Sequence, residues 1–492
     1  MKKALYIILS LCLLLTLAAG GGGSGSAATT EASKTQSNGI ESAHKHCVCA
    51  GKAVNIGEHK ACFNDDGWVE ISTAAELTDA VAAASAAKPA YVALTADIEV
   101  DGYMEINEGV GVYICLNGKT LIAATRNIGN LHIADCTGNG TWTSKKARTI
   151  NCYAGSSCEL YAGSVTASDT VTDTRVFVLD GNADENLQLS EGETYLRIYG
   201  GKIYSDHITT INGACVYAST YGQVYLYNGV ITGATVHTDD TGAGGKIGGN
   251  ICLFGSNSNM YMYGGEVSDG YIKLNSVSGT TKAAWGGNIA TYRGSLYVYG
   301  GVISGGYANG NGGNIGACNT SDYLLLENCT IKDGKTEQFG GNIYSGADAT
   351  HITTLKNAIV SGGDAAKSGG NLFFQNGVLT IEGGEISGGK CAQELGGGIA
   401  AQGNDLEVVL TGNIKFSNNQ GSDYLLRQHS SGKLPYLSLA ELTSTTDIKI
   451  AGNALSAGYV FCKDAPANHT LKAAEGCTLT ADGSKITITP NS

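Results

Sequence analysis

The chain has 492 residues, a formal net charge of −13, and 71 glycines against 4 prolines. Collagen is excluded because it needs a Gly-X-Y period and abundant proline. Nucleic acid and anionic membrane surfaces are not expected as partners, because both attract a basic face and the chain has no cluster of Lys or Arg. So much glycine favours many short strands joined by tight turns, where glycine enters positive φ without steric cost.

The first residues of the chain predict an export signal. Lys2 and Lys3 precede an apolar run at 4–19, which is short for a membrane span but typical of a signal peptide. We therefore expect residues 1–19 to be removed, and Gly20 stands where a lipid-anchored protein would need cysteine. Residues 20–43 are expected to form a flexible linker. No second long apolar run follows, so we expect an extracellular protein, secreted or at the cell surface, without a transmembrane span.

Residues 44–66 form a small segment rich in cysteine and histidine. Four of its side chains have the chemistry of a tetrahedral Zn²⁺ site, namely Cys47, Cys49, His59 and Cys62. The Cys-x-Cys spacing is shorter than in the usual zinc knuckle, and a local disulfide such as Cys49 to Cys62 also suits an exported chain. Both alternatives stay open, and no other cofactor is required. Several later cysteines fall at apolar repeat positions and are expected to be buried thiols.

An amphipathic helix is predicted near 73–87, at the start of a repetitive region that spans residues 67–455. Thr73 followed by Glu76 is a capping-box pattern, and the next residues place an apolar face on one side. The helix is expected to cover the first coil of the repeat, whose edge backbone would otherwise be exposed. Strands are predicted at 91–94, 104–106 and 112–116, with a tight turn at Asn117 and Gly118.

A strand-and-turn pattern then recurs about every 28 residues. Its first signature is Gly-Gly-Asn-Ile, found at 248–251, 286–289, 312–315 and 340–343, with variants at 369–372 and before Ile399. Its second signature is an apolar strand that enters a Gly-Gly or Asn-Gly turn. Because a strand alternates its two sides, the aligned strands should repeat apolar residues at every second position. Two such columns are apolar from Leu196 to Leu410, with Thr353 as the one exception.

Repeats of this length without intervening helices predict an all-β fold, a right-handed parallel β-helix with a capping helix at its N-terminal end. A propeller blade would need about 40 residues and antiparallel hairpins. Residues 456–492 are expected to form irregular coils and a cap, with a closing strand at 485–489. Asparagines of the repeat predict a buried ladder of stacked amides. The ladder residues are Asn250, Asn288, Asn314, Asn342 and Asn371.

These repeats resemble a known group, the glycine-rich, adhesin-like β-helix proteins exported by gut Clostridia and their relatives. The last regular coil is also similar to the repeats of chlamydial polymorphic outer-membrane proteins, with Gly397, Gly398 and Ile399 followed by Phe416 to Asn419. The resemblance covers roughly residues 70–450. It implies a pectate-lyase-like fold and export, but this architecture carries both enzymes and binding proteins.

Outward tyrosines on successive coils predict a two-column strip on one face of the β-helix. Aromatic rings rising by about 4.8 Å per coil suit a glycan chain or a protein at a cell surface. Stacked tyrosines also stabilise a sheet without any ligand. The residues of this predicted binding strip are Tyr199, Tyr225, Tyr227, Tyr261, Tyr263, Tyr297 and Tyr299. An adhesin-like binding protein is the favoured function, because the signatures of polygalacturonases and pectate lyases are missing.

The alternative function is a polysaccharide-active enzyme, either a lyase or a glycoside hydrolase. A lyase would need a Ca²⁺ site and a basic residue, whereas a hydrolase would need carboxylates that converge on one face. The candidate catalytic residues are Asp206, His207, Asp239 and Asp240. Acidic pairs in loops are usually solvated, so enzymatic activity is the less favoured hypothesis.

Overall fold

The computed structural model describes residues 68–491, except 239–245, 276–283, 319–322, 347–349, 393–395, 404–405, 429–434, 440, 444–446 and 454–457. The described residues belong to one compact unit, His44–Ser492. The predicted signal peptide, the linker and the segment with Cys47, Cys49, His59 and Cys62 lie outside the described residues. Asp239 and Asp240 also lie outside them, so the hypotheses on these residues stay predictions.

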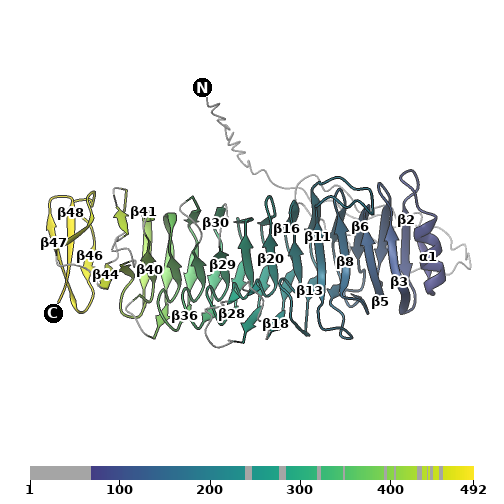
Figure 1. Cartoon of the computed structure of the whole chain (residues 1–492), viewed down its shortest axis with the longest axis horizontal. Helices are drawn as coiled ribbons and strands as arrows, with labels where there is room; N and C mark the ends of the chain where they lie inside the picture. Colours follow the sequence, from purple (N-terminus) through teal and green to yellow (C-terminus); the bar gives the residue numbers. More distant parts are fainter. Residues whose placement is uncertain are drawn as a thin grey trace, which may run out of the picture. The chain divides into compact units, whose positions relative to one another are not determined.

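The described chain is a parallel β-helix, as the sequence predicts (Figure 1). Its main sheet has 36 strands, and the strands of one coil pair in parallel with those of the next. Most coils consist of four segments, which form four stacks of strands along the molecule. We number these stacks 1 to 4 in the order in which one coil visits them. Beside them, β19 (Lys246–Ile247) pairs with β24 (Ala284–Trp285).

Stacks 1 and 2 are neighbours in each coil, and the long strands β38 and β41 run through both. Stack 1 contains β1 (Val69–Ile71), β2 (Ala90–Leu94), β4 (Gly111–Cys115), β6 (Asn130–Ala134), β9 (Ser157–Leu160), β12 (Thr194–Ile198), β16 (Gly222–Leu226), β21 (Asn259–Met262), β26 (Ser295–Val298), β30 (Tyr323–Glu327), β34 (Ile352–Lys356), β38 (Gly377–Ser387), β41 (Leu406–Ser417) and β43 (Tyr436–Ser438). Stack 2 contains β7 (Thr141–Thr143), β10 (Ser164–Thr166), β13 (Lys202–Tyr204), β17 (Val230–Thr232), β22 (Glu266–Ser268), β27 (Val302–Ser304), β31 (Thr330–Lys332) and β35 (Ile359–Ser361).

Stack 3 is a separate sheet of short strands, whereas stack 4 belongs to the main sheet. Stack 3 contains β14 (Ile208–Thr209), β18 (Thr235–Thr238), β23 (Tyr271–Leu274), β28 (Tyr307–Ala308), β32 (Lys335–Thr336), β36 (Asp364–Ala365) and β39 (Lys390–Cys391). Stack 4 contains β8 (Arg148–Tyr153), β11 (Arg175–Asp180), β15 (Val216–Ala218), β20 (Ile251–Phe254), β25 (Ile289–Tyr292), β29 (Ile315–Cys318), β33 (Ile343–Ser345), β37 (Leu372–Phe374), β40 (Ile399–Gln402), β42 (Tyr424–Arg427), β44 (Ile448–Asn453) and β46 (Leu471–Ala473). In the first coils, β3 (Ile98–Ile106) and β5 (Thr120–Asn127) span stacks 2 and 4.

The inward columns predicted from the repeat form the core. Leu296, for example, lies in register between Met260 and Leu324, and all three side chains are fully buried. Each buried side chain of this size contributes about 1.5–3 kcal/mol relative to an exposed one. The exception, Thr353, is also buried, and its hydroxyl lies 3.0 Å from Nε2 of His351. A hydrogen bond therefore compensates for placing this polar side chain in the column.

The predicted asparagine ladder is present, and all five of its residues are fully buried. Nδ2 of each asparagine donates to Oδ1 of the next, over 2.7–2.8 Å. Nδ2 of Asn314 also donates to the carbonyl oxygen of Lys332, while Oδ1 of Asn314 accepts from the backbone N–H of Gly306. Each amide thus links neighbouring coils to one another and satisfies buried backbone groups between stacks 2, 3 and 4.

Asn419 extends this ladder, which the sequence analysis did not predict. Gly398 stands where the repeat would otherwise have asparagine, so the last Gly-Gly-x-Ile motif supplies no amide. Asn419 accepts from Nδ2 of Asn371 at 3.4 Å and from the backbone N–H of Gly389 at 3.0 Å. An asparagine from a later turn therefore takes the place of the missing ladder residue.

Helix α1 (Ala74–Ala82) lies at the N-terminal end of the coils (Figure 1). The predicted capping box is confirmed, because Thr73 Oγ1 accepts from the N–H of Glu76 and Glu76 Oε2 accepts from the N–H of Thr73. Leu77 is fully buried in the main core. The prediction that the helix reaches residue 87 is wrong. A bridge joins Ser85 to Lys88, and Pro89 disfavours helical backbone in the residue before it.

The C-terminal end changes from parallel to antiparallel pairing. The predicted closing strand is observed as β48 (Lys485–Pro490), which lies between β45 (Tyr459–Cys462) and β47 (Cys477–Asp482) in a three-stranded antiparallel sheet. Parallel pairing itself continues to β46, past the predicted limit of the regular β-helix at residue 455. In the part of the chain that the structure describes, no helix is long and apolar enough to span a bilayer.

Local predictions near the first coils are also met. The strands expected at 91–94, 104–106 and 112–116 lie within or beside β2, β3 and β4. Asn117 and Gly118 have φ values of 50° and 72°, as a tight turn of this kind requires. Cys115, Cys152 and Cys158 are buried thiols, as their apolar repeat positions indicate, and Cys215 is a buried thiol at the position that corresponds to Asn250 in the next coil.

Replacing one ladder asparagine tests its structural role. Asn314→Ala removes the amide that joins two neighbouring asparagines, and it leaves the Lys332 carbonyl and the Gly306 N–H without this partner. We expect the free energy of unfolding to fall by about 3 kcal/mol or more, measured in urea. Asn228→Ala makes the same change at an exposed turn residue and should cost less than about 0.5 kcal/mol. Equal effects of the two substitutions would show that the ladder is not needed for stability.

Candidate functional site

The seven tyrosines predicted as a strip do lie together on stack 1 and in the turns that follow its strands. We call them the tyrosine strip, which consists of Tyr199, Tyr225, Tyr227, Tyr261, Tyr263, Tyr297 and Tyr299. In its first column, the Tyr261 ring lies between the rings of Tyr225 and Tyr297, with centroids 4.9 and 5.0 Å away. The ring planes differ by 16° and 6°. Register pairing of the three residues produces this stack, because neighbouring strands are about 4.8 Å apart.

The second column consists of the tyrosine that follows each strand. The centroid distances are 4.9 Å from Tyr199 to Tyr227, 5.2 Å from Tyr227 to Tyr263 and 5.3 Å from Tyr263 to Tyr299. Tyr225 and Tyr227 connect the columns, with 6.2 Å between their centroids. Tyr199 is only 8% exposed, whereas Tyr263 and Tyr299 are 45% and 37% exposed. The accessible part of the strip is therefore its C-terminal end.

Stacking decides which parts of the rings a ligand can reach. A ring with near-parallel neighbours on both sides shares its two faces with them, so a ligand meets mainly ring edges and hydroxyl groups. Burial raises the pKa of Tyr261 to about 12, and the neighbouring Tyr225 and Tyr297 add to this effect. The Tyr261 hydroxyl is therefore neutral near pH 7 and can both donate and accept hydrogen bonds.

The aromatic column is longer than the sequence analysis predicted. From Tyr199 it continues toward the N-terminus through Tyr161, His132, Tyr113, Tyr91 and Trp68. Tyr91, Tyr113 and His132 are register partners in β2, β4 and β6. The sequence does contain one sign of this longer column. Tyr91 and Tyr113 lie in the predicted strands 91–94 and 112–116, at positions between inward apolar residues, where a side chain points outward. The coils between them have unequal lengths, so alignment at a fixed repeat length does not bring these aromatic residues together.

A charged cluster lies where this aromatic column meets the tyrosine strip. In register order, Glu159 follows His132 and precedes Arg197. The Glu159 carboxylate lies 3.3 Å from Nδ1 of His132 and 3.5 Å from Nη1 of Arg197, and it accepts a hydrogen bond from the Tyr161 hydroxyl. The Arg197 guanidinium also lies over the Tyr195 ring, 4.5 Å from its centroid. The sequence analysis missed this cluster because its members come from three different coils.

The environment of Glu159 fixes its charge. Burial alone would raise its pKa, but His132, Tyr161 and Arg197 stabilise the carboxylate and hold the pKa at about 2. A general acid of a glycoside hydrolase needs a raised pKa instead, so that it carries a proton near neutral pH. Glu159 therefore does not suit proton donation, and its three partners mark it as a group that positions the surrounding rings.

Of the four candidate catalytic residues, the structure describes two, and these two are in contact. Asp206 and His207 form a contact of 2.9 Å between Oδ1 and Nε2, and their side chains are 63% and 36% exposed. The other two candidates, Asp239 and Asp240, lie outside the described residues. Among the residues that the structure describes, no group of three or more His, Cys, Asp or Glu side chains is arranged to hold a metal ion.

Comparison with protein-family models, with curated proteins and with solved structures finds no match to this chain. The class of protein is therefore defined by the fold alone, as a parallel β-helix that carries stacked aromatic columns on one face.

The charge of Glu159 predicts a pH-dependent stability. Because its pKa in the folded protein lies below the ordinary value of 4.5, Glu159 stabilises the fold above pH 4.5, and this contribution is lost as the pH falls toward 2. This contribution of Glu159 to the free energy of unfolding is about 3 kcal/mol, because each unit of pKa shift corresponds to about 1.4 kcal/mol. We expect Glu159→Gln to lower the free energy of unfolding at pH 7 and to flatten its decrease between pH 4.5 and 2.

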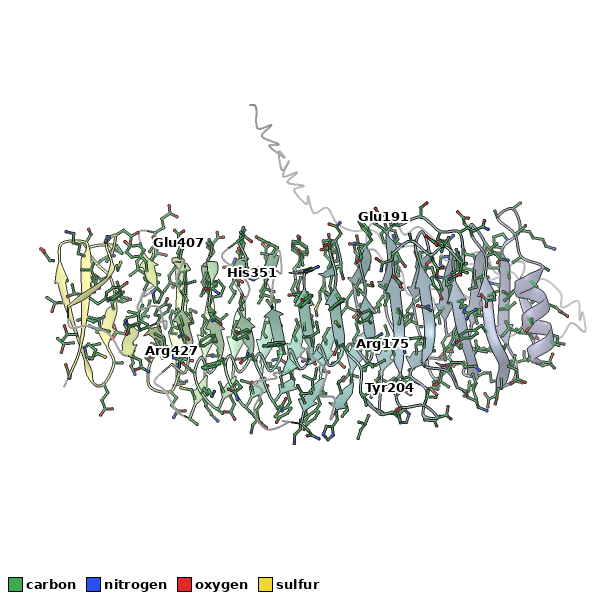
Figure 2. All side chains as sticks on the ribbon, in the orientation of Figure 1. Arg175, Glu191, Tyr204, His351, Glu407 and Arg427 are labelled. Atoms are coloured by element: carbon green, nitrogen blue, oxygen red, sulfur yellow. The ribbon has the colours of Figure 1, made fainter. Side chains whose placement is uncertain are left out.

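Urea unfolding at a series of pH values measures this effect. Glu407→Gln is the matched control, because Glu407 is an exposed carboxylate on stack 1 (Figure 2). It should leave the acid dependence unchanged. Identical pH profiles for wild type and Glu159→Gln would contradict the assignment.

Proposed function

We propose that this chain is an exported, adhesin-like β-helix protein that binds glycans or protein partners at a cell surface through the tyrosine strip. The observation that carries the proposal is the pair of stacked tyrosine columns, whose most exposed rings are Tyr263 and Tyr299. The predicted signal peptide at 1–19 supports an extracellular location. The resemblance of the repeats to exported adhesin-like proteins points to the same class.

The geometry of the strip suits a linear ligand of repeating units. Its two columns present hydroxyl groups and ring edges once per coil, about 5 Å apart along the axis. A glycan chain offers hydroxyl groups and apolar C–H faces at a comparable repeat, so the same contact can recur along several coils. Each single contact is weak, but several contacts made at once by one chain add up to a useful affinity.

The charge of the strip points to a neutral ligand. The protein has a net charge of −13, yet the seven residues of the strip are uncharged tyrosines. At its N-terminal end, the carboxylate of Glu159 lies within 4 Å of Nδ1 of His132 and Nη1 of Arg197, so its charge is compensated. A neutral glycan needs no ion pair with the protein, so it suits a strip made of uncharged tyrosines. For the enzymatic alternative, the described residues offer only the contact between the exposed Asp206 and the partly exposed His207.

Loss of the two most exposed rings tests the proposal. In Tyr263→Ser combined with Tyr299→Ser, the accessible end of the strip loses its ring edges and hydroxyl positions while the buried core residues stay unchanged. On an array of mucin and plant glycans, we expect the affinity for any bound glycan to fall at least about tenfold, which corresponds to about 1.4 kcal/mol.

The matched control is Tyr271→Ser combined with Tyr307→Ser. These two tyrosines also stack, with centroids 4.6 Å apart, but they belong to stack 3. The control variant should bind like wild type. Equal losses in both double variants, or no binding of any glycan or surface protein by wild type, would overturn the proposed function.

A further inference from the structure

Two arginines lie opposite each other at the start of neighbouring strands in stack 4. Arg148 opens β8 and Arg175 opens β11, and they are register partners (Arg175 is labelled in Figure 2). Their Cα atoms are therefore about one strand spacing apart, roughly 4.8 Å. Both side chains are partly buried. Like charges directly opposite in a sheet are destabilising, so this pair needs a physical explanation.

Backbone carbonyl groups use only some of the donors of the two guanidinium groups. Nη1 of Arg148 donates to the carbonyl oxygens of Ala147 and Asp173, over 2.8 and 3.0 Å. Nε of Arg175 donates to the carbonyl oxygen of Asn212 over 2.8 Å. A guanidinium has five N–H groups in a planar fork, so both arginines keep donors for a further acceptor.

In the described part of the chain, no carboxylate forms an ion pair with Arg148 or Arg175. The Asp173 carboxylate raises the pKa of both arginines, but it forms no ion pair with either of them and accepts a hydrogen bond from the Thr210 hydroxyl. The Tyr217 ring lies under Arg175, with the guanidinium carbon 3.8 Å from the ring centroid, and fixes that guanidinium. Burial lowers the pKa of Arg175 to about 10, and the charge of Arg148 adds to this effect, yet both groups stay protonated at neutral pH.

Arg126 shows how the same β-helix satisfies an arginine elsewhere. Its guanidinium also lies over a tyrosine ring, 4.0 Å from the centroid of Tyr103. Unlike the pair, however, Arg126 forms an ion pair with Glu105, with Nη1 and Oε1 3.2 Å apart. The pair therefore differs from Arg126 in having no direct ion pair, although the Asp173 carboxylate acts on both arginines from a greater distance and favours their charged forms.

We propose that Arg148 and Arg175 together bind an oxyanion, namely the sulfate or carboxylate group of a ligand, with Tyr217 holding Arg175 in place. One anion between the two guanidinium groups removes their mutual repulsion and accepts from their remaining N–H groups. Planar guanidinium forks match sulfate and carboxylate oxygens in paired hydrogen bonds. The site lies on stack 4 and does not depend on the tyrosine strip of stack 1.

Binding of inorganic sulfate and of a sulfated disaccharide, measured by calorimetry at low ionic strength, tests this inference. Wild type should bind at least the disaccharide, and Arg148→Gln and Arg175→Gln should each weaken binding about tenfold or more. Arg126→Gln, the matched control, should bind like wild type. Binding of the disaccharide alone would identify a sugar-borne anion, and binding of both would identify a site for the anion itself; either supports the proposal.

A second measurement covers the case in which the glutamine variants do not fold. Wild-type crystals soaked in selenate should show anomalous density between the two guanidinium groups. Density only elsewhere on the surface would identify an adventitious ion only and would overturn the proposal. No binding of either probe by wild type, or an equal loss in Arg126→Gln, would overturn it as well. The Tyr263 and Tyr299 double variant should keep its sulfate binding, which separates this test from that of the strip.

Discussion

Parallel pairing in register imposes one rule on every coil, because each residue then lies about 4.8 Å from its counterpart in the next coil. Leucine stacks on methionine in the core, asparagine on asparagine in the ladder, and tyrosine on tyrosine outside. A slip of one residue would exchange the inner and outer faces of a strand. The ladder opposes such a slip, since the amide of Asn314 meets those of Asn288 and Asn342 only when the coils are aligned.

The same stacking gives the outer face its properties. Tyr261 stabilises the sheet through Tyr225 and Tyr297, and it also keeps its hydroxyl at a fixed height on the face. A binding surface made in this way is rigid before the ligand arrives, which lowers the entropic cost of binding. In register order, Glu159 and Arg197 stand between His132 and Tyr225, and their charges compensate each other within the protein.

Sequence periodicity predicted the features that repeat at nearly constant spacing. The core columns, the ladder and the strip fall in coils that carry at least one of the two repeat signatures, the Gly-Gly-Asn-Ile motif or the apolar strand that enters a Gly-Gly or Asn-Gly turn. The aromatic column from Trp68 to Tyr161 was not predicted, because the coils before residue 196 differ in length. Asn419 was not predicted as a ladder residue, since it lies outside the motif that supplies the others. The Glu159 cluster and the Arg148 and Arg175 pair depend on contacts between coils, which local sequence does not display.

Removing one whole coil is the most direct test of the claim that register alone builds the molecule. Deletion of residues 304–331 joins Ile303 to Lys332, which is the register partner of Ser304, so the coils on either side meet in alignment. We expect this variant to keep its β-sheet circular dichroism and a cooperative unfolding transition, with Asn288 now bonded to Asn342. Deletion of only residues 304–317 breaks the alignment and should abolish that transition. Equal behaviour of the two deletions would contradict the account.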